Sequence, residues 1–273
     1  IADPYQYPNS FTLLAPTEVN ITPSVGTGHM TIVDPVRKLV WHGYTCNITH
    51  QGKLIPYVVP GCAIQATLAK IDALDGDAIT TTLGSPGETR YGWGDCEIRI
   101  WEALRHKIEH VLRCVFSVSL VRSVGSQWNV GQPWPTFQTD FPALDKQSPD
   151  YYSGDIPFGV LMAIPSSFDI ATFRVAGKNL TANQMTIAKA AQGYGIIARD
   201  TTGTYGGAAQ FSLDMEPDVA ILNPAFVTEI NEFMPYLVQQ LAFVTNMSPN
   251  TYPYAGGGLP VVPRLPPAFQ GDT

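Results

Sequence analysis

The sequence predicts a mainly β protein, with one β-rich domain and two or three peripheral helices. Hydrophobic residues make up 45% of the 273 residues, enough to bury one sizeable core. Most apolar segments alternate with polar residues or are rich in β-branched side chains, as strands are. Turn signals containing Gly and Pro separate these segments.

The first 25 residues carry four prolines and are predicted to be extended, because proline excludes a long helix. A β-hairpin is predicted next, with strands through 30–32 and 39–41 on either side of the turn signal Asp34-Pro35. A second turn at 51–53 precedes the apolar run 54–59.

Residues 65–76 are predicted as the first helix, ended by a glycine. Its apolar positions recur at three-residue spacing: Leu68, Ile71 and Leu74. A shorter helix at 101–106 leads into 108–118, which is rich in β-branched residues and is predicted as a long buried strand. Residues 122–155 lack periodicity and are too long for a passive connection, so a binding surface is expected there.

A strand is predicted at 159–164, and the best helix of the chain at 181–193, with Thr181 as its N-cap. A strand follows at 194–199. Residues 225–244 show a second amphipathic helical pattern, which Pro235 should interrupt. The predicted domain spans 1–248, and the Pro- and Gly-rich residues 249–273 form an extended tail.

The charge pattern excludes several partners. The net charge is −7 and no cluster of Lys and Arg occurs, so nucleic acid and anionic membrane surfaces would be repelled. No apolar run is long enough to span a bilayer as a helix. Only 14% of residues are charged, so solubility is expected to come from neutral polar groups or from an attached group, for which a glycan is the obvious candidate.

Four Asn-x-Ser/Thr triplets begin at Asn20, Asn47, Asn179 and Asn246. Proline follows the first and the last triplet directly, so Asn47 and Asn179 are the better glycosylation sites. The alternative is that these are chance triplets in a Thr-rich chain. The first residues lack the features of a signal peptide, so we expect a mature secreted chain whose leader has been removed.

The four cysteines are Cys46, Cys62, Cys96 and Cys114, spread singly and without zinc-site spacing. No metal or other cofactor is predicted. Two disulfides in an oxidising compartment fit better than four buried thiols. Cys46 to Cys62 with Cys96 to Cys114 is the simplest of the three connectivities.

Four segments, in order, resemble an uncharacterised family of secreted proteins common in actinobacteria. Residues 29–35 with Trp41 are similar to its His-x-x-hydrophobic-x-Asp-Pro hairpin ending in Trp. Residues 98–112 resemble its Arg-x-x-Glu-x-x-x-Gly-x-Ile-x-His-x-Leu element. The third segment is Ile-Pro-Phe-Gly at 156–159. The fourth is 190–200, which is similar to the family's Ala-Leu-x-x-Tyr-Gly-x-x-hydrophobic-x-Asp segment.

This resemblance covers residues 27–203 in patches and implies a jelly-roll-like β-sandwich and secretion. His106 stands where the family usually has Gly. The cysteines and glycosylation triplets are not part of the family pattern, which suggests a eukaryotic secreted relative. The family carries no agreed activity, so the resemblance implies nothing about the chemistry.

Glu102 and His110 are the first catalytic candidates, because a carboxylate on a short helix and an imidazole on the next strand could share a proton in one cleft. The alternative is structural: Glu102 caps its own turn and His110 is a core histidine. His29 and Asp34 could form a base and its orienting group, or Asp34 could simply begin a turn.

Aromatic residues in Gly- and Pro-rich loops are candidates for sugar stacking: Trp93, Trp128, Trp134, Tyr151 and Tyr152. Alternatively, these aromatic residues pack over the β-sandwich in small hydrophobic clusters beside the main core. A glycosidase needs two spaced carboxylates, and a polysaccharide lyase needs a cation or amide beside a base. The acidic run 214–218 could bind calcium, although a solvated turn is the simpler interpretation.

Motifs for nucleotide binding, zinc proteolysis and serine-esterase chemistry do not occur in the sequence. We therefore expect a secreted, extracellular carbohydrate-active protein, a glycoside hydrolase or polysaccharide lyase acting on an extracellular glycan. The alternative is a non-catalytic lectin, wall component or filament subunit. The expected partner is a glycan or polysaccharide, and the Pro-rich ends could also reach a neighbouring copy in self-association.

Overall fold

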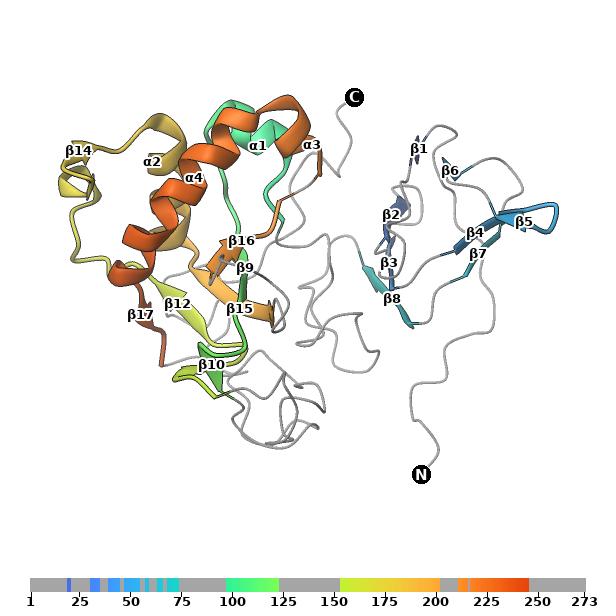
Figure 1. The fold of residues 1–273 in the computed structure, drawn as a ribbon, viewed down its shortest axis with the longest axis horizontal. Coiled ribbons are helices and arrows are strands. Elements are labelled where there is room, and N and C mark those ends of the chain that lie inside the picture. The colour runs from blue at the N-terminus through green and yellow to red at the C-terminus, as the bar shows by residue number, and fades with distance from the viewer. Residues whose placement is uncertain are drawn as a thin grey trace. The chain divides into compact units, whose positions relative to one another are not determined.

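The computed structural model describes residues 19–20, 30–34, 39–44, 47–54, 57–58, 63–65, 68–73, 97–122, 153–201, 211–215 and 217–245. The chain divides into two compact units, residues 1–95 with 264–273, and residues 96–263 (Figure 1). The sequence predicted one domain over 1–248. Among the described strands, no sheet draws strands from both units.

The N-terminal unit contains antiparallel strands only, among its described residues. One sheet has the order β2 (Met30–Asp34), β3 (Leu39–Tyr44), β8 (Leu68–Ala73). A second has the order β5 (Lys53–Leu54), β4 (Asn47–His50), β7 (Ala63–Gln65), and β1 (Val19–Asn20) pairs with β6 (Tyr57–Val58).

Both predicted turns of this unit are confirmed by the strands around them. Asp34 pairs with Leu39 at the end of the β2–β3 hairpin, and Ile32 lies opposite Trp41. Gln51 and Gly52 join β4 to β5 with positive φ angles of 50° and 76°. Two successive positive φ angles give a backbone twist that suits a tight hairpin.

The helix predicted over 65–76 is wrong. Residues 63–65 form β7 and 68–73 form β8. All six residues of β8 pair with β3, with Ile71 opposite Trp41. The segment reads Leu-Ala-Lys-Ile-Asp-Ala. The pairing of its six residues with β3 outweighs the weak helical preference indicated by the three-residue spacing of its apolar side chains.

The second unit is built on a five-stranded mixed sheet with the order β16-β9-β15-β12-β17. Its strands are β9 (Leu112–Phe116), β12 (Leu161–Ala163), β15 (Ile196–Thr201), β16 (Phe211–Leu213) and β17 (Ala242–Phe243). The central pair, β9 and β15, is parallel, and the other neighbours are antiparallel. β10 (Val121–Arg122) and β11 (Ile156–Pro157) form a separate parallel pair.

The predicted strands at 108–118 and 159–164 are confirmed in place but are shorter, as β9 and β12. Residues 108 and 110–114 are buried even where the backbone is not strand. The apolar, β-branched composition of residues 108–118 therefore predicted which residues are buried better than it predicted the length of the strand. The strand predicted at 194–199 is β15, displaced by two residues.

Four helices are described in this unit: α1 (Ile100–Arg105), α2 (Ala182–Gly193), α3 (Pro217–Leu222) and α4 (Pro224–Leu237). Thr181 caps α2 as predicted, since its side chain accepts a hydrogen bond from Gln184 N. Shorter elements are the 3-10 turns η2 (Ile170–Thr172) and η3 (Val238–Gln240) and the hairpin β13 (Arg174–Val175) with β14 (Lys178–Asn179).

The helix predicted over 225–244 is only partly correct. Pro235 lies inside α4, which continues to Leu237. The chain then passes through η3 and ends in the strand β17. Burial of Phe233, Met234 and Leu237 against the core holds the last turn of α4 despite the hydrogen bond that proline cannot make.

Helices α2 and α4 pack together and contribute one apolar side of the core. Ile187 and Ala191 of α2 and Phe226, Ile230 and Phe233 of α4 are fully buried. The described region therefore combines sheets with a few helices, as predicted, and its largest sheet is mixed. Within that region, no helix has the length and hydropathy needed to cross a membrane.

Candidate functional site

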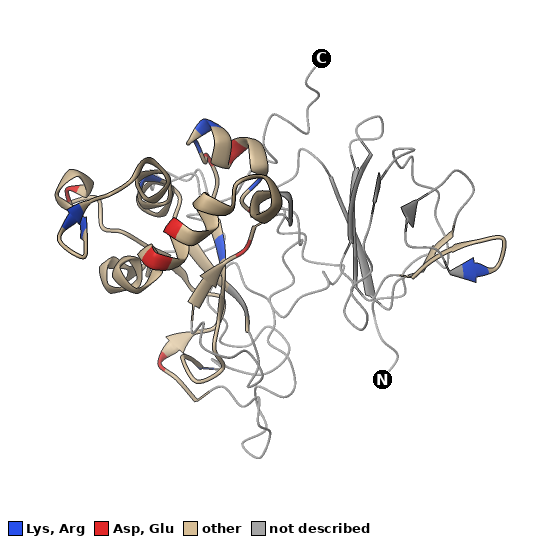
Figure 2. Ribbon diagram, turned by 45° about the horizontal axis from the view of Figure 1, so that its top comes forward, with Lys and Arg blue, Asp and Glu red and all other residues tan. Residues whose placement is uncertain are grey.

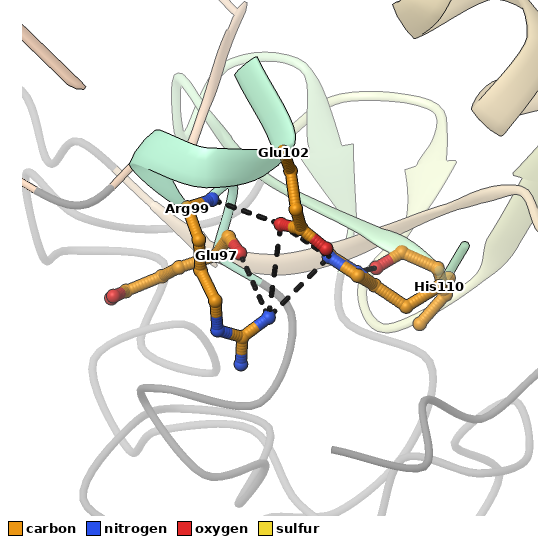
Figure 3. A network of polar contacts seen from close by, with 5 residues as sticks. Glu97, Arg99, Glu102 and His110 are labelled. Atoms are coloured by element: carbon orange, nitrogen blue, oxygen red, sulfur yellow. Dashed lines mark hydrogen bonds and ion pairs between the residues drawn. The ribbon is translucent and has the colours of Figure 1, made fainter. Parts of the chain in front are cut away.

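The candidate catalytic pair, Glu102 and His110, lies near the start of the second unit. Ile98 donates its backbone N–H to Asp214 O at 3.0 Å and forms a parallel bridge with Met215. Helix α1 begins two residues later, as the short helix predicted at 101–106. The segment between α1 and β9 then places His110 beside the helix, eight residues after Glu102 (Figure 3).

Glu102 and His110 are hydrogen bonded, as one of the two sequence interpretations required. His110 Nε2 lies 3.0 Å from Glu102 Oε1 and 3.1 Å from Oε2. The backbone N–H of Arg99 donates to Glu102 Oε2 at 3.0 Å, and Arg99 Nη1 lies 3.8 Å from the same oxygen. Figure 3 shows the side chains of Arg99 and His110 meeting at the Glu102 carboxylate.

The position of one proton on His110 follows from its neighbours. His110 Nδ1 lies 2.8 Å from Val111 O, and a carbonyl oxygen can only accept a hydrogen bond. Nδ1 therefore carries a hydrogen in this arrangement. Arg99 Nη1, which can only donate a hydrogen bond, lies 3.5 Å from His110 Nε2.

All three side chains are buried, with relative exposures of 0% for Arg99, 4% for Glu102 and 1% for His110. Glu102 accepts the N–H of the residue before its own helix, which is the capping role of the structural interpretation. Both ring nitrogens of His110 have partners inside the protein. The buried cluster therefore offers a reactant little surface.

A second ionic cluster was not predicted. Arg113 on β9 is buried, with its Nη2 2.7 Å from Glu97 Oε1 and its Nε bonded to Asp214 Oδ2. The side chains of Glu97 and Asp214 are 22% and 18% exposed. Arg113 lies inside the strand that the sequence predicts to be buried, and a buried arginine requires acidic partners. Its position is therefore the sequence signal for this cluster.

The two clusters meet at Glu97. Its carbonyl oxygen accepts a hydrogen bond from Arg99 Nη1 at 3.4 Å, while its carboxylate binds Arg113. Asp214 belongs to this network, so the acidic run 214–218 supplies an arginine partner. Across the described residues, no group of three or more His, Cys, Asp or Glu side chains could hold a metal ion.

Cys114 is a free thiol, in contrast to the predicted bridge with Cys96. It is completely buried on β9, and its Sγ donates to Ile197 O at 3.1 Å. Burial raises the pKa of Cys114 well above its ordinary value, Asp214 raises it further, and Arg113 opposes the shift. The Cys114 side chain forms part of the buried hydrophobic core. Cys46, Cys62 and Cys96 lie outside the described residues.

Several other predicted site residues lie outside the described part of the chain: His29, Trp93, Trp128, Trp134, Tyr151, Tyr152 and Asn246. Asp34 ends β2 and Asn20 ends β1, where only the backbone is described. Asn47 and Asn179 are exposed, on β4 and β14. Both better glycosylation candidates are therefore accessible.

No family model, curated protein or solved structure matches this chain. Its function has to be inferred from its own residues. Blue Lys and Arg positions and red Asp and Glu positions both occur on the described ribbons of the second unit (Figure 2).

Proposed function

We propose that this is an extracellular, N-glycosylated, carbohydrate-directed protein that binds its glycan without cleaving it. The observation that carries the non-catalytic half is the burial of Glu102 and His110, whose polar atoms are all paired inside the protein. An acid–base pair must reach the proton that it transfers. A buried, paired set of this kind favours a structural role.

The carbohydrate half rests on sequence features. Five aromatic residues occur in Gly- and Pro-rich segments, and aromatic faces suit sugar rings. The exposure of Asn47 and Asn179 supports glycosylation and hence an extracellular location. For the N-terminal unit we keep the jelly-roll-like β-sandwich as a proposal, supported by the antiparallel pairing of its described strands.

A polysaccharide lyase is the second candidate, favoured by one specific feature of the cluster. Arg99 Nη1 lies 3.5 Å from His110 Nε2 and 3.8 Å from Glu102 Oε2. A cation beside a carboxylate and an imidazole is the set of groups needed to neutralise a uronate and remove a proton from it. For this activity the buried cluster would have to open to substrate.

The test combines a glycan array with assays for reducing ends and for unsaturated uronate products. We expect binding to one class of glycan without turnover. Turnover that is lost in Glu102→Gln would instead establish the enzyme. Neither binding nor turnover, together with ordered self-assembly, would indicate a structural subunit.

The matched control is Glu109→Gln, because Glu109 is close in sequence but exposed, in an ion pair with Lys107 at 2.9 Å. Thermal unfolding of both variants separates a loss of folding from a loss of chemistry. A Glu102→Gln variant that keeps its melting temperature while losing turnover would contradict the non-catalytic proposal.

A further inference from the structure

Among the described residues, β17 is the last strand at one edge of the five-stranded sheet. Val244 N donates to Leu161 O at 2.9 Å, so residues 161 and 244 form a hydrogen-bonded pair. Met162 and Phe243 are the next pair along the ladder, and pairs of the two kinds alternate in antiparallel sheets. The N–H and C=O of Phe243 therefore point away from β12, toward the outer edge.

Within the described part of the chain, these two outward groups have no hydrogen-bond partner. The phenyl ring of Phe243 is itself 48% exposed. The opposite edge differs, because Ile98 bridges to Met215 just beyond β16 and covers the chain there. One edge of the sheet is thus partly covered, and the other offers both backbone groups and an aromatic side chain.

The usual protection of an edge strand is missing from the sequence of β17 and its surroundings. No charged residue occurs between Glu232 and Arg264. Residues 241–245 read Leu-Ala-Phe-Val-Thr, with high β-propensity and no proline. Natural edge strands usually carry a lysine, a proline or a bulge that blocks pairing with another chain.

We propose that β17 is a self-association site, at which it pairs antiparallel with β17 of a second copy. Phe243 would lie opposite its own counterpart on a twofold axis, and each would donate its N–H to the other's C=O. Thr245 N–H would reach Leu241 C=O of the other copy. The two sheets would then continue as one, independently of any carbohydrate function.

A second copy fits this edge because the pattern is self-complementary. On a twofold axis every residue near the centre meets itself or a close neighbour. A charge there would face a like charge, and the neutral stretch from 233 to 263 avoids this cost. The neutrality favours a second copy over an acidic or basic peptide.

Sedimentation of the full chain over a range of concentrations tests the proposal, after enzymatic removal of N-glycans because Asn246 closely follows β17 in the sequence. We expect a concentration-dependent dimer. Phe243→Lys should raise its dissociation constant about tenfold or more, by placing two like charges together. Ile221→Lys is the control, because Ile221 is 71% exposed on α3, away from the edge.

Phe243→Pro is a second edge variant that should preserve the fold, because it removes only the outward N–H and leaves the ladder with β12 intact. Phe243→Cys should also form an intermolecular disulfide, because hydrogen-bonded antiparallel pairs have Cα atoms about 5.5 Å apart. Leu222→Cys, on exposed Leu222 of α3, should not. A chain that stays monomeric up to about 1 mM, or a dimer that Phe243→Lys leaves unchanged, would overturn the proposal.

Discussion

At the scale of single residues, Glu102 shows how a contact can be predicted while its role stays open. One of the two interpretations of the sequence brought a carboxylate at the start of a helix into contact with an imidazole eight residues later, and the two groups are 3.0 Å apart. The buried Arg99 beside them was not expected. Sequence spacing brings groups together, but burial depends on what the rest of the chain packs over them.

Glu102→Ala should destabilise the protein by about 1 to 3 kcal/mol, because it removes the buried carboxylate that accepts the Arg99 backbone N–H and contacts His110. Glu109→Ala, at an exposed surface pair, should change the free energy of unfolding by no more than about 0.5 kcal/mol. Urea unfolding followed by circular dichroism measures both. Equal effects of the two variants would contradict the structural role of the cluster.

Cys114 gives a prediction about pH. Its pKa is raised in the folded protein, chiefly by burial, so above about pH 8.5 the thiol ionises in the unfolded chain before it does in the folded one. The unfolded state then binds fewer protons, and stability should fall as the pH rises from 8.5 to 10. Cys114→Ala, compared with the unmodified chain under reducing conditions, should flatten this decline. An identical decline in both proteins would contradict it.

At the scale of elements, local signals predicted α2 and the β2–β3 hairpin, since Thr181 and Asp34-Pro35 act through their own neighbours. They failed for β8, where pairing with β3 decides the conformation. They also failed at Pro235, which tertiary burial holds inside α4. Elements defined by a cap or a turn could be predicted, and those defined by distant partners could not.

The end of α1 carries a strained residue. His106 has a φ of 51°, in the left-handed region that favours glycine, and it is exposed. His106→Gly should therefore stabilise the protein by up to about 1 kcal/mol, by relieving the left-handed strain.

The control for this change is Arg105→Gly, one residue earlier and inside the helix, which should cost about 1 kcal/mol. Thermal unfolding of the two variants against the unmodified chain makes the comparison. A loss of stability in His106→Gly as large as that in Arg105→Gly would show that the C-cap conformation does not limit stability at this site.

At the scale of the whole molecule, the chain divides into two compact units, residues 1–95 with 264–273 and residues 96–263. Composition gives the total number of apolar residues but not how they are divided between separate cores. The pairing of β9 with β15, far apart in the chain, closes the second sheet within residues 96–263. Neither the parallel pairing nor the resulting boundary has a local signature in the sequence.

This boundary predicts that residues 96–263, produced alone, fold cooperatively. Their sheet, their four described helices and both arginine clusters lie inside that range. The fragment should show a single urea transition, slow hydrogen exchange in β9 and α4, and the same loss of stability on Glu102→Ala as the full chain. The control is a fragment over 120–263, which lacks α1 and β9 and should not fold. If the longer fragment also lacks slowly exchanging amides, residues 96–263 do not form an independent folding unit.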